Sequence, residues 1–163
     1  MNTDLTAERL REILHYDPTT GIFIWLEKTC LKVVVGKEAG VHKRGYLYIG
    51  LFGKRYLGHR LAWLYMEGEW PSLNIDHKDG DPSNNRWKNL RAANQSQNIA
   101  NSRLRTGKAL LKGVRKTPSG TFQARIICDG RERHLGSYKT EEKAHLAYVH
   151  AARILHGEFA CAG

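Results

Sequence analysis

The sequence has little cysteine and no long apolar run. Its three cysteines, Cys30, Cys128 and Cys161, lie far apart and form no C-x-x-C pair. Neither a disulfide framework nor a zinc knuckle is therefore indicated, and we expect no structural zinc. No segment has the length of a membrane span or of a signal-peptide core. These absences favour a cytoplasmic protein in a reducing compartment, without a membrane partner.

Acidic residues are outnumbered by basic ones. The 163 residues include 26 Lys and Arg against 16 Asp and Glu, which gives a formal net charge of +10 and a pI near 9.7. A chain of this charge with no long basic amphipathic helix favours nucleic acid over an acidic membrane as its polyanionic partner. The alternative is a basic chain that is simply soluble or associated with ribosomes.

The segment 73–102 carries an Asp-His pair, an Asn-rich turn and a second group of amides. Asp76 offers a hard oxygen ligand for a divalent cation, and His77 offers a base able to activate water. Adjacent strand residues point to opposite faces, so the two can share a site only if the strand twists or ends there. The turn-forming stretch 79–85 begins two residues later and favours such an end.

Asn98 is a second candidate ligand. The residues before it, 94–97, have the pattern of a helix cap and first turn, which would place the Asn98 amide oxygen near a helix start. One carboxylate and one amide leave most of an octahedral shell for water and substrate phosphate, as magnesium prefers. We expect one divalent ion, Mg²⁺ with Mn²⁺ as the alternative, at Asp76 and Asn98.

Five short elements of the chain resemble a known family. They are HRLAW at 59–63, IDHKDG at 75–80, NN at 84–85, NL at 89–90 and QN at 97–98. In order and spacing they are similar to the HNH homing endonucleases of phages and mobile introns. The last motif position is Asn here, where other branches of that family have a second histidine.

The resemblance assigns roles to these residues. It implies that His77 is the general base, that Asp76 and Asn98 are the metal ligands, and that Asn89 orients the loop and the histidine. It also implies a ββα-metal core, in which a two-stranded hairpin and the following helix hold the ion, and a phage-encoded protein acting in a bacterial cytoplasm. His59, in the HRL element, is interpreted as structural rather than catalytic.

The N-terminal region, residues 1–55, is predicted to be rich in β structure and to pack on the nuclease core, residues 56–102. The expected elements are a helix over 6–14, a turn over 17–21, a strand over 22–26, a hairpin over 45–57 that turns at Gly53, and a helix over 60–66. Three of the four tryptophans, Trp25, Trp63 and Trp70, indicate that the main hydrophobic core lies here.

Residues 103–111 are predicted to be a basic linker. Arg103, Arg105 and Lys108 recur there without an apolar stripe, an arrangement that suits a segment lying along a phosphate backbone. The alternative is a solvated linker.

Residues 112–163 are predicted to form a three-stranded sheet backed by one helix. The expected strands are 113–116, 121–128 and 133–138, and the helix begins after a Thr140 cap. The predicted inner face of that helix is Ala144, Ala147, Tyr148, Ala151 and Leu155. Strand alternation places Gln123 and Arg125 on the opposite face of the sheet, where a sheet can enter a major groove.

The same region resembles a second family. GVRKTPSGTFQARI at 113–126 and HLGSYKTEEKAHLAYVHAA at 134–152 are similar to the AP2/ERF DNA-binding domain. That family reads DNA with side chains of its three strands, and the matching positions here are Arg115, Lys116, Gln123 and Arg125. Several positions that plant members use for base contacts differ in this chain, namely Thr117, Ser119, Ile127 and His134, so no target sequence is implied.

The sequence therefore predicts an α+β protein with a ββα-metal core, a β-rich N-terminal region and an AP2-like C-terminal domain. The predicted function is hydrolysis of phosphodiester bonds in double-stranded DNA, by a monomer that nicks or by a homodimer that cuts both strands. Two alternatives stay open: a DNA-binding regulator that has kept the nuclease fold without activity, and a phage nuclease with little sequence preference.

Overall fold

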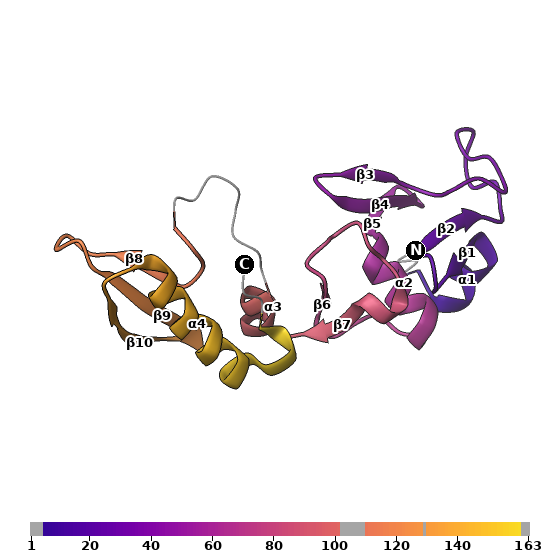
Figure 1. Cartoon of the computed structure of the whole chain (residues 1–163). Coiled ribbons are helices and arrows are strands. Elements are labelled where there is room, and N and C mark those ends of the chain that lie inside the picture. Colours follow the sequence, from indigo (N-terminus) through magenta and orange to yellow (C-terminus); the bar gives the residue numbers. More distant parts are fainter. Residues whose placement is uncertain (1–4, 102–109, 129, 161–163) are drawn as a thin grey trace. The chain divides into compact units, whose positions relative to one another are not determined.

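The computed structural model describes residues 5–101, 110–128 and 130–160. The chain divides into two compact units, an N-terminal unit of residues 1–92 and a C-terminal unit of residues 93–163. The position of one unit relative to the other is not determined (Figure 1). Within the described ranges no helix is long and apolar enough to cross a membrane.

The N-terminal unit mixes short helices with small sheets (Figure 1). Its elements are α1 (Ala7–Ile13), β1 (Leu14–Asp17), β2 (Ile22–Trp25), β3 (Val41–Lys43), β4 (Tyr46–Leu51), β5 (Lys54–Leu57), α2 (Gly58–Glu67), β6 (Asn74–His77), the 3-10 helix η1 (Trp87–Asn89) and β7 (Leu90–Ala93), whose last residue already belongs to the C-terminal unit. The sheets are β1-β2, β3-β4-β5 and β6-β7. In the first two, neighbouring strands are antiparallel.

Local sequence rules account for several of these boundaries. The Thr6 hydroxyl accepts a hydrogen bond from the Arg9 amide at 3.3 Å and so caps α1, as predicted. The turn between β4 and β5 has Phe52 and Gly53 at φ 51° and 76°, the left-handed pair that suits a two-residue hairpin. The predicted turn at Gly53 is therefore confirmed. The strands β1 and β3 were not predicted, and α1 ends one residue earlier than expected because Leu14 begins β1.

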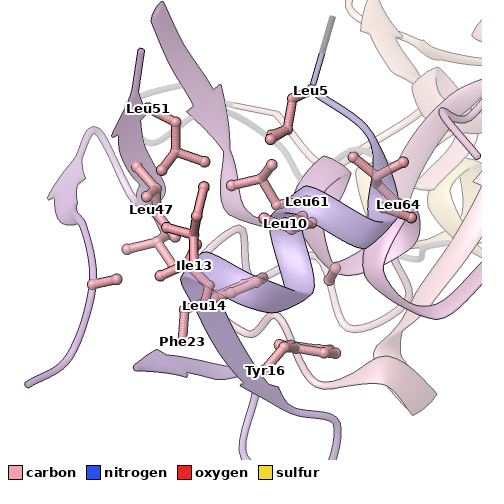
Figure 2. Packing of buried hydrophobic residues seen from close by; sticks show 14 of the residues in the cluster. Leu5, Leu10, Ile13, Leu14, Tyr16, Phe23, Leu47, Leu51, Leu61 and Leu64 are labelled. Atoms are coloured by element: carbon pink, nitrogen blue, oxygen red, sulfur yellow. The ribbon is translucent and has the colours of Figure 1, made fainter. Parts of the chain in front are cut away.

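One hydrophobic core joins the elements of the N-terminal unit (Figure 2). Its largest fully buried side chains are Leu10, Ile13, Leu14, Tyr16, Phe23, Ile49, Leu51, Leu61 and Leu64. Ile75 of β6 and Leu90 of β7 belong to the same core. Trp25 is buried in it, while Trp63 and Trp70 pack against it partly exposed. The predicted N-terminal region and residues 56–92 of the predicted nuclease core thus share one core, and the two-unit division falls inside the 56–102 range.

The β1-β2 hairpin packs against the segment that leads into η1. The Trp87 amide donates to the Pro18 carbonyl at 3.0 Å, and the Tyr16 hydroxyl donates to the Asn85 carbonyl at 2.6 Å. Gly21, at φ 78°, lies so close that a Cβ atom there would be 2.6 Å from both Asn85 C and Arg86 N. The turn of this hairpin therefore needs glycine for conformation and for space.

The C-terminal unit contains the second group of elements. They are α3 (Gln95–Asn101), β8 (Val114–Lys116), β9 (Phe122–Cys128), β10 (Arg131–Tyr138), α4 (Glu141–His156) and the 3-10 helix η2 (Gly157–Phe159). The strands form an antiparallel sheet in the order β10-β9-β8. The predicted three strands and helix are present, and kinship with the AP2/ERF family stays a prediction.

Helix α4 packs on this sheet through small residues. Thr140 caps the helix by accepting from the Lys143 amide. Ala144, Tyr148 and Ala152 are its buried residues. The predicted inner face included the first two, and its Ala151 and Leu155 are partly buried and pack against the same cluster. Ala147 is partly buried, and Ala152 was not predicted. Gly113 touches the Tyr148 ring so closely that a Cβ would clash at 2.1 Å.

Two glycines test the packing of the β1-β2 turn. Both Gly21 and Gly36 have left-handed φ, 78° and 81°, but a Cβ at Gly36 would meet nothing within 4 Å. Gly36→Ala is expected to cost about 1 kcal/mol of unfolding free energy for its conformation alone. Gly21→Ala adds a backbone clash, for which we expect a further 1–3 kcal/mol, roughly.

Urea unfolding followed by tryptophan fluorescence measures this difference, because all four tryptophans lie in residues 1–92 and report on the N-terminal unit alone. Equal losses for the two variants would contradict close packing of the turn against Asn85.

Candidate active site

Strand β6 ends at the Asp-His pair, which is the geometry that the sequence required for the two residues to share a site. Asp76 and His77 are only 7% and 6% exposed. They follow Ile75, so the last three residues of the strand are all buried. An acid and an imidazole buried side by side at a strand end need partners, because an unpaired buried polar group is costly.

The partner of His77 is Asn85. The distance from His77 Nε2 to Asn85 Oδ1 is 3.3 Å. Asn85 Nδ2 donates to the Ser83 carbonyl, so the amide oxygen is the atom that faces His77. Nε2 must then carry the proton, and Nδ1 holds the lone pair. The role of His77 as general base stays a prediction.

Asn85 is itself held by the core. It is 3% exposed, and its carbonyl accepts from the buried Tyr16 hydroxyl. Burial, assisted by the charge of Asp17, raises the pKa of Tyr16, which therefore stays a donor. Sequence reasoning gave Asn85 no role, although the NN pair at 84–85 was among the motif elements that could have indicated one.

Asn89 holds the loop between β6 and η1. Its Oδ1 accepts from the Asp79 amide, and its Nδ2 donates to Asp79 Oδ1 and to the Asn84 carbonyl, at distances from 2.8 to 3.1 Å. The backbone reinforces this, since the Lys78 amide donates to the Asn89 carbonyl at 2.8 Å. These bonds tie the loop to the end of β6 directly after His77, and the catalytic role of Asn89 stays a prediction.

Asp79 and Asp81 stabilise the same loop. Asp79 accepts from the Asp81 amide and from Asn84 Nδ2, and Asp81 accepts from Ser83. Burial alone would raise the pKa of Asp79, but these hydrogen bonds and that from Asn89 outweigh it and lower the pKa. The two carboxylates therefore stabilise the turn-forming stretch 79–85.

The partner of Asp76 is Arg91 of β7. Arg91 Nε and Nη2 each lie 2.9 Å from Asp76 Oδ2, and the two side chains are 8% and 11% exposed for Asp76 and Arg91 respectively. Sequence reasoning did not single out Arg91. Its position two residues after Asn89, on the strand paired with β6, brings it beside the carboxylate.

His59 lies next to the catalytic candidate. It is buried, and its ring centroid is 5.0 Å from that of His77 at an interplanar angle of 87°. Burial, followed by repulsion from His77 and Arg60, lowers the pKa of His59 to about 3. The ring is therefore uncharged at neutral pH.

Asn98 lies in α3, in the C-terminal unit. The helix begins with a reciprocal cap: Asn94 Oδ1 accepts from the Gln97 amide, and Gln97 Oε1 accepts from the Asn94 amide. This is the cap predicted from residues 94–97. The elements β6, β7 and α3 follow one another in the predicted order, and the pairing of Asn98 with Asp76 around an ion stays a prediction.

The donor chemistry of these residues suits a magnesium-type ion. Asp76 and Asn98 offer hard oxygen atoms. Among the described residues no group of three or more His, Cys, Asp or Glu side chains could hold a metal. That Asp76 and Asn98 hold one divalent ion stays a prediction.

The sheet of the C-terminal unit carries the other predicted contacts. Arg115 lies directly opposite Gln123 in the β8-β9 register, and Arg125 is hydrogen-bonded to Gln123 Oε1 at 2.8 Å, so these three share the face that α4 leaves uncovered. Lys116 lies opposite Phe122. Together with Arg115, Gln123 and Arg125 it lines an open depression on the surface of this unit. The predicted linker residues Arg103, Arg105 and Lys108 lie outside the described residues.

The chain is similar to known HNH endonucleases. Residues 56–100 match the family model of the HNH endonucleases. The chain is 35% identical over 119 residues to the uncharacterized HNH endonuclease L560 of Acanthamoeba polyphaga mimivirus, covering 72% of this chain and 62% of that protein. It is 42% identical over 66 residues to the DNA endonuclease I-HmuI of Bacillus phage SP01, covering 37% and 38%.

The sequence of this chain is 26% identical to that of a solved structure on DNA binding and cleavage by the HNH homing endonuclease I-HmuI. The match covers 89% of this chain and 88% of that one, with a TM-score of 0.43. The chain spans less than two thirds of the length of both curated relatives.

We expect the buried Asp76–Arg91 pair to contribute to the stability of the N-terminal unit. Arg91→Ala leaves a buried carboxylate without its cation, and we expect a loss of about 3 kcal/mol in the unfolding free energy of the N-terminal unit. The matched control is Arg9→Ala, which removes an ion pair with Glu27 whose side chains are 39% and 45% exposed. Screening by solvent should leave that variant near the wild-type value. Urea unfolding by tryptophan fluorescence compares them, and similar losses would contradict the buried pair.

Proposed function

We propose that this chain, whose residues 56–100 match the family model of the HNH endonucleases, is a metal-dependent DNA endonuclease that hydrolyses phosphodiester bonds. The observation that carries the proposal is the end of β6. There the buried His77, hydrogen-bonded to Asn85, follows the buried carboxylate of Asp76. The resemblance to I-HmuI supports a homing endonuclease of phage origin.

The chemistry that these residues support is activation of water. His77 Nδ1 takes a proton from a water molecule that attacks the phosphorus in line, while Nε2–H stays on Asn85. Asp76 and Asn98 would hold one divalent ion, Mg²⁺ or alternatively Mn²⁺, which when bound neutralises charge on the phosphate and stabilises the leaving 3′ oxygen. Asn89 keeps the 79–84 loop in place beside the base.

The C-terminal unit is proposed to position the nuclease on duplex DNA. Its uncovered sheet face presents Arg115, Gln123 and Arg125, and Arg115 and Lys116 are exposed. This agrees with the AP2/ERF resemblance and with the net charge of +10. Phosphate contacts from the linker residues Arg103, Arg105 and Lys108 belong to the same proposal.

A DNA-binding regulator without nuclease activity is the second candidate. It keeps the basic sheet face and makes no use of the geometry at His77. A nuclease with little sequence preference is the third, and it would give random rather than discrete products. Cleavage of DNA separates all three.

The nuclease proposal predicts magnesium-dependent conversion of supercoiled plasmid to open-circle or linear DNA. His77→Ala should abolish conversion and leave DNA affinity within a few fold, because the base takes part only in the reaction. The matched control is His15→Ala, an exposed histidine of β1 in the same unit, which should cleave like the wild type. Binding without cleavage under any divalent metal would favour the regulator, and loss of binding by His77→Ala would assign that residue a structural role.

The positioning proposal predicts a salt dependence of binding. If about five to eight cations contact phosphates, log affinity should fall against log salt with a slope of roughly −4 to −7. Arg115→Ala should weaken binding and reduce that slope by about 1 if the side chain contacts a phosphate. Lys143→Ala, on exposed α4 surface, is the control and should leave the slope unchanged. Fluorescence anisotropy with a labelled duplex measures both, and equal slopes for the two variants would exclude Arg115 from the interface.

A further inference from the structure

Two aromatic rings, those of Tyr46 and His59, lie beside the His77 ring, in addition to Asn85. Tyr46 of β4 lies with its ring centroid 5.8 Å from His59 and 6.3 Å from His77, and both contacts are close to edge-on. His59 meets His77 at 5.0 Å, nearly perpendicular. Edge-to-face packing at these distances is the favoured arrangement of aromatic rings. Three elements, β4, α2 and β6, each contribute one ring to this cluster.

The approach of His59 is set by its neighbour in the chain. Gly58 begins α2, and a Cβ atom there would be 2.8 Å from a side-chain atom of Leu47. The helix therefore starts in direct contact with β4 at the residue after Tyr46. His59, the next residue of α2, is brought against Tyr46 and His77 by that contact.

The hydrogen bond to Asn85 is a weak restraint on its own. At 3.3 Å it is long for an N–H···O bond. Rotation of the imidazole about its bond to Cβ would exchange the positions of its nitrogen and carbon atoms. The contacts of the His77 ring with Tyr46 and His59, at centroid distances of 6.3 and 5.0 Å, restrain this rotation in addition to the hydrogen bond.

We propose that His59 is a positioning residue, whose ring, together with that of Tyr46, holds the His77 ring in the orientation that leaves Nε2 on Asn85 and Nδ1 as the proton acceptor. The inference rests on the proposed nuclease function for its catalytic consequence, but the ring orientation itself exists whether or not DNA is cut.

The test compares two substitutions in the full-length protein. His59→Ala removes the ring, and we expect the single-turnover cleavage rate to fall by about ten- to hundredfold, with the Kd for DNA within a few fold. His59→Phe restores a ring of similar shape without nitrogen atoms and should recover most of the lost rate. His42→Ala, an exposed histidine of β3, is the control for histidine removal and should match the wild type.

A second readout does not depend on cleavage. The ¹³Cδ2 chemical shift of His77 in histidine-labelled protein distinguishes the Nε2–H from the Nδ1–H form. Wild type and His59→Phe should show the Nε2–H form alone, and His59→Ala should show a mixture. Tryptophan fluorescence confirms that each variant is folded under the conditions used.

The outcomes separate the two proposals. If the wild-type protein does not cleave DNA, the proposed nuclease function is overturned. The ¹³Cδ2 chemical shift of His77 then tests the positioning role of His59 independently of cleavage. An unchanged His77 shift in His59→Ala overturns the positioning role. If His59→Phe is as inactive as His59→Ala while the shift stays that of the wild type, His59 acts through its own nitrogen atoms, and the positioning role is again overturned.

Discussion

Asn85 connects the hydrophobic core of the N-terminal unit to the histidine at the end of β6. Its carbonyl is bound by the Tyr16 hydroxyl at 2.6 Å, its amide nitrogen by the Ser83 carbonyl, and its amide oxygen by His77. The bonds with Tyr16 and His77 are buried, and the bond with Ser83 is partly buried. Breaking a buried bond leaves a costly unsatisfied group. The orientation of His77 is therefore stabilised by the folding of the unit as a whole.

This arrangement explains why the N-terminal elements and the motif residues form one compact unit. The β1-β2 hairpin supplies Tyr16 and a turn at Gly21 that fits only without a Cβ. The β3-β4-β5 sheet supplies Tyr46, and α2 supplies His59. The segment from β6 to β7 by itself is a short hairpin with a loop, and a structure of that size buries too little to fix the His77 ring. The preceding residues supply the missing core.

Basic side chains occupy both buried and exposed positions. In the N-terminal unit Arg91 is largely buried and paired with Asp76, while Lys43, Lys54 and Arg55 are exposed. In the C-terminal unit Arg115 and Lys116 are exposed on the sheet. A buried pair of this kind determines local geometry, while exposed cations on a sheet are available to a polyanion and respond to salt.

Much of the secondary structure followed from the sequence because its causes are local. The caps at Thr6, Asn94 and Thr140 and the hairpin turn at Gly53 each depend on residues within four positions of one another. The strands β1 and β3 were missed. The first follows directly on a helix, and the second is three exposed residues long and pairs only through β4.

The sequence by itself determined the positions of the Asp-His pair, the amide-rich loop and the three-strand-plus-helix pattern, because motif spacing and alternation are properties of neighbouring residues. Only the tertiary structure decided the partners: Asn85 and His59 for His77, Arg91 for Asp76, and Tyr16 for Asn85. Tyr16 and Asn85 are 69 residues apart in the chain. Contacts over that distance arise from the packing of a shared core, and no local pattern of residues specifies them.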